Sequence, residues 1–283
     1  MWGLPPIHSE HAHGTKKPLY WWLLTSRRWL PPRPINVYVV EHANGLVLFD
    51  TGQDRASVTD PSYFPGGLNG VVYDRLAKFH IAEHETLDAQ LGTLGYSTAD
   101  VDKAVISHLH QDHIGGIPQL GGSDLLITPA EWAQLSGFSP EARGFLRPRI
   151  DVPGARWKHT TFAPTTDAGP FGEAFDVMGD GSIVLLPTPG HTPGSVSMLV
   201  HRRDLPPLLM VGDLTYEAGL LERRQLPGVG DRRTRPDHRQ SPHPRRPATR
   251  TRHPPRPRPD RSTASVRTPP PSPIPSTSVL HAP

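Results

Sequence analysis

The most regular feature of the sequence is a short hydrophobic run that ends in a polar residue. Ile35–Val40 and Leu46–Phe49 are two such runs, and Asn44-Gly45 lies between them. Because Asn-Gly favours the backbone conformations of a tight turn, this segment predicts a β-hairpin. Similar runs predict strands over Pro18–Thr25, Lys103–Ser107, Leu125–Ile127, Ser182–Leu186, Ser195–His201 and Leu208–Val211.

Helical features separate some of these runs. The leucines between residues 87 and 94 recur at helical spacing, and Gly95 stands where a helix commonly ends. Pro129–Leu135 predicts a second helix, because proline is favoured in the first turn. Residues 136–170 show no clear period, and we expect them to be irregular. Strands that alternate with helices predict a layered α/β fold.

Polar residues follow four of the predicted strands. Asp50, His108 and Asp213 come directly after hydrophobic runs, and His191 follows a fourth run after a short turn. Layered α/β folds assemble their sites at such strand ends. We therefore expect these four side chains to lie close together.

The composition changes sharply near residue 235. Residues 235–283 hold 14 Pro and 10 Arg but no Gly and no aromatic residue, so their net charge is about +8, whereas residues 1–234 carry about −5. A segment with so little to bury cannot offset the entropy lost on ordering. We expect a flexible N-terminus over 1–17, one folded domain over 18–234 and a disordered tail over 235–283.

Composition also excludes several classes of protein. The chain has no Cys, which rules out disulfides, thiolate metal sites, Fe–S clusters and a cysteine nucleophile. No hydrophobic run approaches the ~18 residues of a membrane span, and the start lacks the pattern of a signal peptide. We expect a cytoplasmic protein with a small-molecule substrate. The acidic body argues against a nucleic-acid partner, and the sequence leaves the oligomeric state open.

One short segment carries most of the candidate chemistry. His108-Leu109-His110-Gln111-Asp112-His113 places three imidazoles and one carboxylate within six residues. In an extended segment, His108 and His110 can face one metal ion, while Asp112 and His113 can turn toward a second. Nitrogen and carboxylate ligands suit zinc, and also iron or manganese.

The cluster and three other segments resemble one known family. Ser107–Gly116 is similar to the signature of the metallo-β-lactamase superfamily. Asp50–Gly52 resembles its early strand-end aspartate, Thr188–Ser195 its third-histidine loop, and Gly212-Asp213 its bridging aspartate. The resemblance covers roughly residues 18–234. It implies an αββα sandwich, in which helices flank two mixed β-sheets and the metal site lies at one edge.

The resemblance also implies roles for individual residues. Two divalent metal ions, with zinc as the expected metal, would be held by His108, His110, Asp112, His113, His191 and Asp213. Asp213 would bridge both ions, and Asp112 and Tyr216 would take part in catalysis. Tyr216 resembles the tyrosine that the N-acyl-homoserine lactonase branch places beside the substrate carbonyl. Asp50 is expected to accept a hydrogen bond from a ligand imidazole.

These expectations together predict a metal-dependent hydrolase that opens a lactone ester with a metal-bound hydroxide, which would give it a quorum-quenching activity. The alternatives are a glyoxalase-II-like thioesterase, a mono-iron sulfur dioxygenase and an inactive truncated member.

The C-terminal tail departs from the lactonase pattern. That pattern requires a final histidine on a late strand, and we expect neither a strand nor a ligand histidine in the tail, so only one ion would bind if the second site is incomplete. His281 and the other tail histidines are therefore not assigned as ligands. The change of composition is typical of a shifted reading frame, and we state this as a hypothesis.

Overall fold

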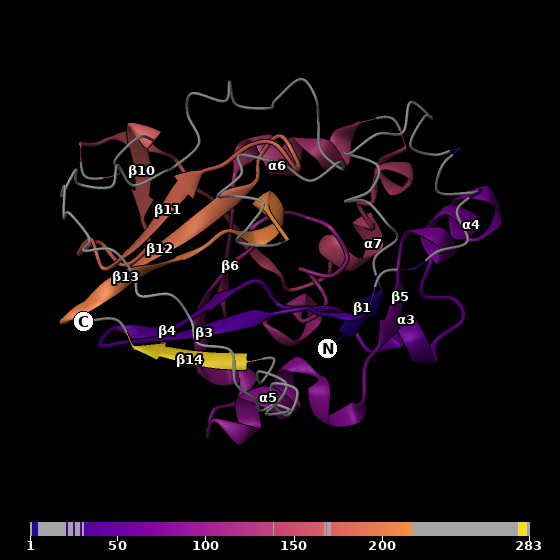
Figure 1. The fold of residues 1–283 in the computed structure, drawn as a ribbon, viewed down its shortest axis with the longest axis horizontal. Helices are drawn as coiled ribbons and strands as arrows, with labels where there is room; N and C mark the ends of the chain where they lie inside the picture. Colours follow the sequence, from indigo (N-terminus) through magenta and orange to yellow (C-terminus); the bar gives the residue numbers. More distant parts are fainter. Residues whose placement is uncertain are drawn as a thin grey trace, which may run out of the picture.

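The fold is built on three β-sheets (Figure 1). The computed structural model describes residues 2–4, 21, 25, 29, 31–137, 139–166, 168, 171–216 and 277–281. The largest sheet has the strand order β14-β3-β4-β6-β7-β8. Its strands are β3 (Val37–His42), β4 (Gly45–Phe49), β6 (Val101–Val105), β7 (Asp124–Ile127), β8 (Arg156–His159) and β14 (Thr277–His281).

The predicted hairpin is confirmed. Strands β3 and β4 pair antiparallel, with Tyr38 opposite Phe49 and His42 opposite Gly45. Strands β4, β6, β7 and β8 are successive parallel neighbours. The carboxyl ends of β4 and β6 therefore lie at one edge of the sheet, and the chain continues from them into Asp50 and His108.

A second sheet of five strands has the order β13-β12-β11-β10-β9, and its described pairs are antiparallel. Its strands are β9 (Ala163–Pro164), β10 (Glu173–Asp176), β11 (Ile183–Pro187), β12 (Val196–Arg202) and β13 (Leu205–Met210). A small third sheet consists of β1 (Trp2–Leu4), β2 (Arg33–Pro34) and β5 (Lys78–His80).

Two hydrophobic cores lie on opposite faces of the six-stranded sheet. Val40 and Val47 point toward the five-stranded sheet, where they share a core with buried residues such as Met198. Their neighbours Val39 and Leu48 belong to the other core, on the opposite face. This alternation follows from the period of two in a β-strand. Each fully buried aliphatic side chain stabilises the fold by about 1.5–3 kcal/mol. Because its side chains enter both cores, the hairpin connects the two layers. The expected sandwich fold is confirmed.

Short helices connect the strands. The α-helices are α3 (Ala56–Thr59), α4 (Gly67–Leu76), α5 (Leu87–Thr93), α6 (Pro129–Trp132) and α7 (Arg147–Ile150). The 3₁₀ turns are η1 (Glu83–Glu85), η2 (Thr98–Asp100), η3 (Ile117–Gln119), η4 (Ala133–Ser136), η5 (Pro140–Arg143) and η7 (Gly212–Leu214). The leucine pattern is confirmed in α5, where Leu87 and Leu91 are buried and Gly95 follows with φ +84°.

Two local expectations are wrong. Trp21 and Thr25, the described residues of the predicted strand 18–25, are helical, and the Thr25 hydroxyl donates to the Trp21 carbonyl at 2.7 Å. A continuous hydrophobic run fits either element, so the pattern was ambiguous. The stretch 136–170, expected to be irregular, contains α7, β8 and β9. Strand β8 was not predicted because three of its four residues are exposed and only one is half-buried, so it has no hydrophobic run.

The tail contains a strand that the sequence did not predict. Thr277–His281 forms β14, which pairs in parallel with β3 and places His281 opposite Glu41. The unpaired backbone groups of an edge strand favour such an addition. Glu41 is next to the hairpin turn, at the end of β3 away from Asp50, so this register keeps His281 away from the strand ends described below. The rest of 217–283 and most of 1–30 lie outside the described residues.

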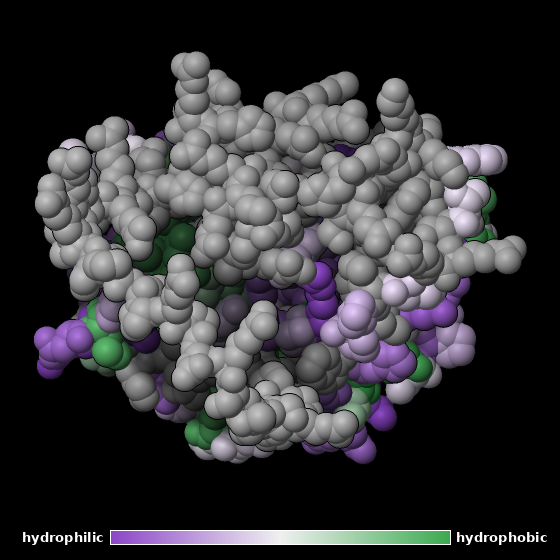
Figure 2. Space-filling model, viewed as in Figure 1, coloured by the Kyte–Doolittle hydropathy of each residue, from purple (hydrophilic) through white to green (hydrophobic). Residues whose placement is uncertain are grey.

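The surface in view is mixed in polarity. Figure 2 shows hydrophobic residues of the described part in separate areas among hydrophilic ones. Within the described ranges, the structure has no helix with the length and hydrophobicity that crossing a bilayer requires.

Candidate metal centre

The site begins at Asp50, directly after β4. Asp50 is 3% exposed and has φ +62°, a conformation that non-glycine residues rarely adopt. Its backbone N–H donates to the carbonyl of Val105, at the end of β6, at 2.8 Å. Backbone strain of this kind is often found at functional sites. The two strand ends are thereby tied together where the histidine segment begins.

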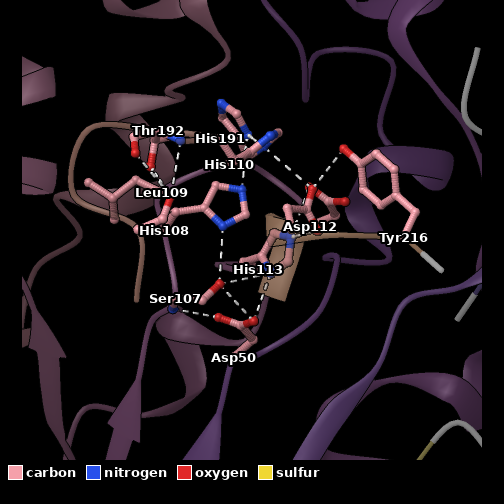
Figure 3. Close-up of polar contacts among 12 residues, drawn as sticks. Asp50, Ser107, His108, Leu109, His110, Asp112, His113, His191, Thr192 and Tyr216 are labelled. Atoms are coloured by element: carbon pink, nitrogen blue, oxygen red, sulfur yellow. Dashed lines mark hydrogen bonds and ion pairs between the residues drawn. The ribbon is translucent and has the colours of Figure 1, made fainter. Parts of the chain in front are cut away.

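The Asp50 carboxylate organises the start of that segment (Figure 3). It accepts hydrogen bonds from the Ser107 backbone N–H at 2.7 Å and from the Ser107 hydroxyl at 2.9 Å. Its Oδ2 also lies 2.8 Å from Nδ1 of His113. Because Nδ1 faces Asp50, Nε2 is directed toward the site. Asp50 thus has the contact that the sequence predicted.

Three imidazoles converge above this carboxylate. Nε2 of His108 lies 3.0 Å from Nδ1 of His110, which lies 2.9 Å from Nε2 of His191. We call His108, His110 and His191 the imidazole group. Nitrogens that share one zinc ion at 2.0–2.1 Å in tetrahedral geometry are about 3.3 Å apart. The observed spacing is close to that value.

Burial and electrostatics keep His108 and His110 neutral. Burial lowers the pKa of His110 to about 3, and neighbouring His191 adds to the effect. Burial and the charges of His113, His110 and His191 also lower the pKa of His108 well below its usual range. Neutral imidazoles present lone pairs rather than protons, and this is the form that binds a metal ion.

A second cluster, which we call the mixed group, consists of His108, His113 and Asp213. The two carboxylate oxygens of Asp213 divide between neighbours, because Oδ1 lies 3.4 Å from Nε2 of His113 and Oδ2 lies 3.4 Å from Nε2 of His191. Asp213 therefore stands between the mixed group and the imidazole group. Asp112 lies beside them, with Oδ1 3.7 Å from Nε2 of His113.

The mixed group has the opposite electrostatics. Burial alone would lower the pKa of His113, but the charges of Asp50, Asp112 and Asp213 raise it well above its usual range. Burial raises the pKa of Asp112. For Asp213, burial acts to raise the pKa, but the charges of His113, His191 and His110 outweigh it, so the pKa is lowered. The carboxylates around His113 therefore create a field that favours a cation.

The donor set fits divalent metal ions. Nε2 of His113 is buried, and among the described residues its nearest carboxylate oxygen, Oδ1 of Asp213, lies 3.4 Å away without a well-formed hydrogen bond. A buried polar atom whose hydrogen bonding is incomplete is costly, and a bound ion would remove that cost. Together with the neutral rings of His108 and His110, this makes the site chemically suited to a metal.

Backbone contacts orient His110 from behind. The carbonyl of Arg143 accepts a hydrogen bond from the His110 ring, which acts to raise its pKa. Gly144 packs on the same ring with φ +95°, and a Cβ there would stand 2.9 Å from the ring carbon Cδ2. Only a residue without a side chain fits this contact. The ring is therefore held with Nδ1 toward the other histidines.

Tyr216 lies next to Asp213. Its hydroxyl donates to Oδ2 of Asp213 at 3.2 Å, and its backbone carbonyl accepts from Arg33 at 3.2 Å. Burial and the charges of Asp213 and Asp112 raise the pKa of Tyr216 well above 10, so the hydroxyl stays protonated at neutral pH. The structure thus brings Tyr216 to the candidate ligands.

Two contributors to the site were missed in the sequence. No sequence pattern indicates a role for Ser107, although its hydroxyl lies 3.1 Å from Nδ1 of His108. Glu131 was read only as part of a helix, yet it contacts both histidine loops. The pattern Thr128-x-x-Glu131 is typical of a helix N-terminus and would have drawn attention to Glu131, but not to its true partners.

Comparisons with known proteins agree with this geometry. The model of the metallo-beta-lactamase superfamily matches residues 30–245. N-acyl homoserine lactonase AttM from Rhizobium radiobacter is 31% identical over 198 residues, which cover 69% of this chain and 70% of that protein.

Two solved structures share the fold at 20% sequence identity. A B. thuringiensis AiiA variant with N-decanoyl-L-homoserine bound has a TM-score of 0.62, with 81% of this chain and 78% of that one covered. An N-acyl homoserine lactone hydrolase with N-hexanoyl-L-homoserine bound at its catalytic metal centre has a TM-score of 0.63, with 85% and 80% covered. The family match and the AttM identity establish that the chain belongs to the metallo-beta-lactamase superfamily and is a metallo-hydrolase.

Proposed function

We propose that this hydrolase opens lactone rings, with N-acyl homoserine lactones as its substrate class. The observation that carries the proposal is that a protonated tyrosine hydroxyl adjoins the candidate metal ligands, since Tyr216 donates to Asp213 at 3.2 Å. The names of AttM and of the two solved structures support the choice of substrate. Hydrolysis of such signal molecules would make the activity quorum-quenching.

The proposed ligand set follows the two groups. The imidazole group would hold one ion, and His113 and Asp112 would hold a second, with Asp213 shared between them. Zinc is the proposed metal because nitrogen and carboxylate ligands at this spacing suit it. When bound, divalent ions lower the pKa of a coordinated water from 15.7 to about 7 and polarise an ester carbonyl.

Tyr216 and Asp112 would act directly on the substrate. The Tyr216 hydroxyl would donate a hydrogen bond to the carbonyl oxygen as that oxygen gains negative charge. Asp112, whose pKa is raised by its desolvation, would take up the proton that water loses on attacking the carbonyl carbon. It would then deliver this proton to the ring oxygen when the ester bond breaks.

Metal analysis combined with a substrate panel tests the proposal. The full chain, loaded with zinc, is assayed by pH-stat on an N-acyl homoserine lactone and separately on a glutathione thioester. We expect two ions per chain and acid release from the lactone. Preferred thioester turnover would instead indicate the glyoxalase-II-like activity, one iron with oxygen uptake on a persulfide would indicate the dioxygenase, and no turnover would indicate an inactive member. The cytoplasmic location stays a prediction from the sequence.

A further inference from the structure

A buried carboxylate joins the two loops that carry the imidazole group. Glu131, in the first turn of α6, is 0% exposed. It is not one of the candidate metal ligands, and its role does not follow from the ligand pattern. Burying a carboxylate costs several kcal/mol unless hydrogen bonds compensate. The position of its hydrogen-bond donors therefore indicates what this group does.

Both oxygens of Glu131 accept hydrogen bonds from the histidine loops. Oε1 accepts from the backbone N–H of Leu109, which lies between His108 and His110, at 3.0 Å. Oε2 accepts from the hydroxyl of Thr192, which follows His191, at 2.6 Å. Oε2 also accepts from the backbone N–H of Gly194 at 3.0 Å. One carboxylate thus joins residues 83 positions apart in sequence through Leu109 and Thr192.

Further contacts hold the same helix end against the His191 loop. The Thr128 hydroxyl accepts from the Glu131 backbone N–H at 3.1 Å and donates to the Gly194 carbonyl at 2.8 Å. A Cβ on Gly194 would stand 2.2 Å from the Glu131 backbone nitrogen, so only glycine permits this approach. The Ser195 hydroxyl, 2.6 Å from Thr192 Oγ1, completes the network. The contact is therefore close and has little room for adjustment.

We propose that Glu131 is a positioning residue that sets the separation of the His108–His110 segment from His191, and so the geometry of the imidazole group. The proposal rests on the metal-binding role of that group and is independent of the lactone substrate. A carboxylate suits this role better than an amide, because all three partners are donors and a glutamine would face one of them with its own N–H groups.

Cobalt binding tests the proposal without any substrate. Co²⁺ is titrated into the metal-free full-length chain, and its visible absorption reports the coordination geometry. Glu131→Gln is expected to weaken the tighter Co²⁺ site on the order of 10-fold to 100-fold and to change its spectrum. Thr192→Val, which removes one of the three donors, is expected to give a smaller change in the same direction.

Two control variants separate positioning from stability. Ser123→Ala removes a buried hydrogen bond of 2.6 Å to the Val101 carbonyl, away from both loops, and should lower the melting temperature without changing Co²⁺ binding. Glu173→Gln changes an exposed glutamate on β10 and should change neither. Each variant is measured by thermal unfolding and by Co²⁺ titration.

The outcomes are distinct from those of the activity assay. Wild-type Co²⁺ affinity and spectrum in both Glu131→Gln and Thr192→Val would overturn the proposal, as would a wild-type chain that binds no Co²⁺. Should Glu131→Gln fail to fold, Thr192→Val alone decides the question. A chain that binds Co²⁺ as expected but opens no lactone would refute the proposed function and leave the role of Glu131 intact.

Discussion

The imidazole group and the mixed group share His108 but differ in charge. The imidazole group has only nitrogen donors, and burial keeps His110 neutral with a pKa of about 3. In the mixed group, the pKa of His113 is held well above its usual range by the carboxylates of Asp50, Asp112 and Asp213, of which only Asp213 belongs to the group. The same sheet edge thus holds two histidines, His108 and His110, that can bind a cation without losing a proton, and a third, His113, that must exchange a proton for it. The difference lies in what the outer side of each ring contacts, because His113 faces the Asp50 carboxylate and His110 faces the backbone carbonyl of Arg143.

Removing His108, which the two groups share, should have the largest effect because it should abolish metal binding at both. His108→Ala deletes a proposed ligand of the first ion, and loss of that ion disturbs the shared Asp213 on which the second ion depends. We therefore expect loss of both ions and a fall in lactone kcat/KM of about 10³-fold or more, since bound metals supply several kcal/mol. Elemental analysis and initial rates measure this. His84→Ala, at an exposed position on η1, is the control. Full metal content in His108→Ala would contradict both groups.

Removing the tyrosine donor should affect catalysis while both groups stay intact. Tyr216→Phe is expected to lower kcat on the order of 10²-fold, as with other oxyanion donors. Metal content should equal that of the wild type, because Tyr216 donates to Asp213 and is not one of the proposed ligands. Steady-state kinetics and elemental analysis on one preparation measure both. An unchanged kcat/KM on the lactone would show that the hydroxyl has no catalytic role.

Changing Asp50 should separate the two groups. Asp50→Asn weakens the contact of 2.8 Å that orients His113, and we expect the affinity of the mixed group to fall on the order of 10-fold to 100-fold. The imidazole group should keep its ion. A two-site zinc titration measures this, with exposed Asp88→Asn as the control. Equal weakening of both sites would mean that the groups do not act separately.

The smallest effect concerns pH. His108 and His110 stay neutral far below pH 6.5, so zinc binding should displace no proton from these two rings between pH 5 and 7. His113 carries a proton across this range, and zinc must displace it, so affinity of the mixed group should rise up to about tenfold per pH unit. Calorimetry in two buffers of different ionisation enthalpy counts the protons released. If zinc affinity changed with pH in the same way at both sites, the predicted difference in charge between the two groups would be wrong.

The sequence alone predicted the fold class and the candidate ligands, because local patterns carry that information. Asn44-Gly45 determined the hairpin, and the hydrophobic runs placed Asp50 and His108 at neighbouring strand ends. Prediction from the sequence failed where the hydrophobic pattern was weak or ambiguous. The helical Trp21 and the strand β14 were missed, since a short hydrophobic segment fits several structures and its pairing depends on a free sheet edge elsewhere.

Residue identity and order therefore determined which donors this protein offers to a metal: imidazoles and carboxylates, clustered within six positions and completed by His191 and Asp213. Only the tertiary structure decided which nitrogen of each ring faces inward and which carboxylate stands between the groups. It also decided that Glu131 joins two loops far apart in sequence. The physical reason is that ring orientation and loop separation depend on hydrogen bonds between segments that no local pattern connects.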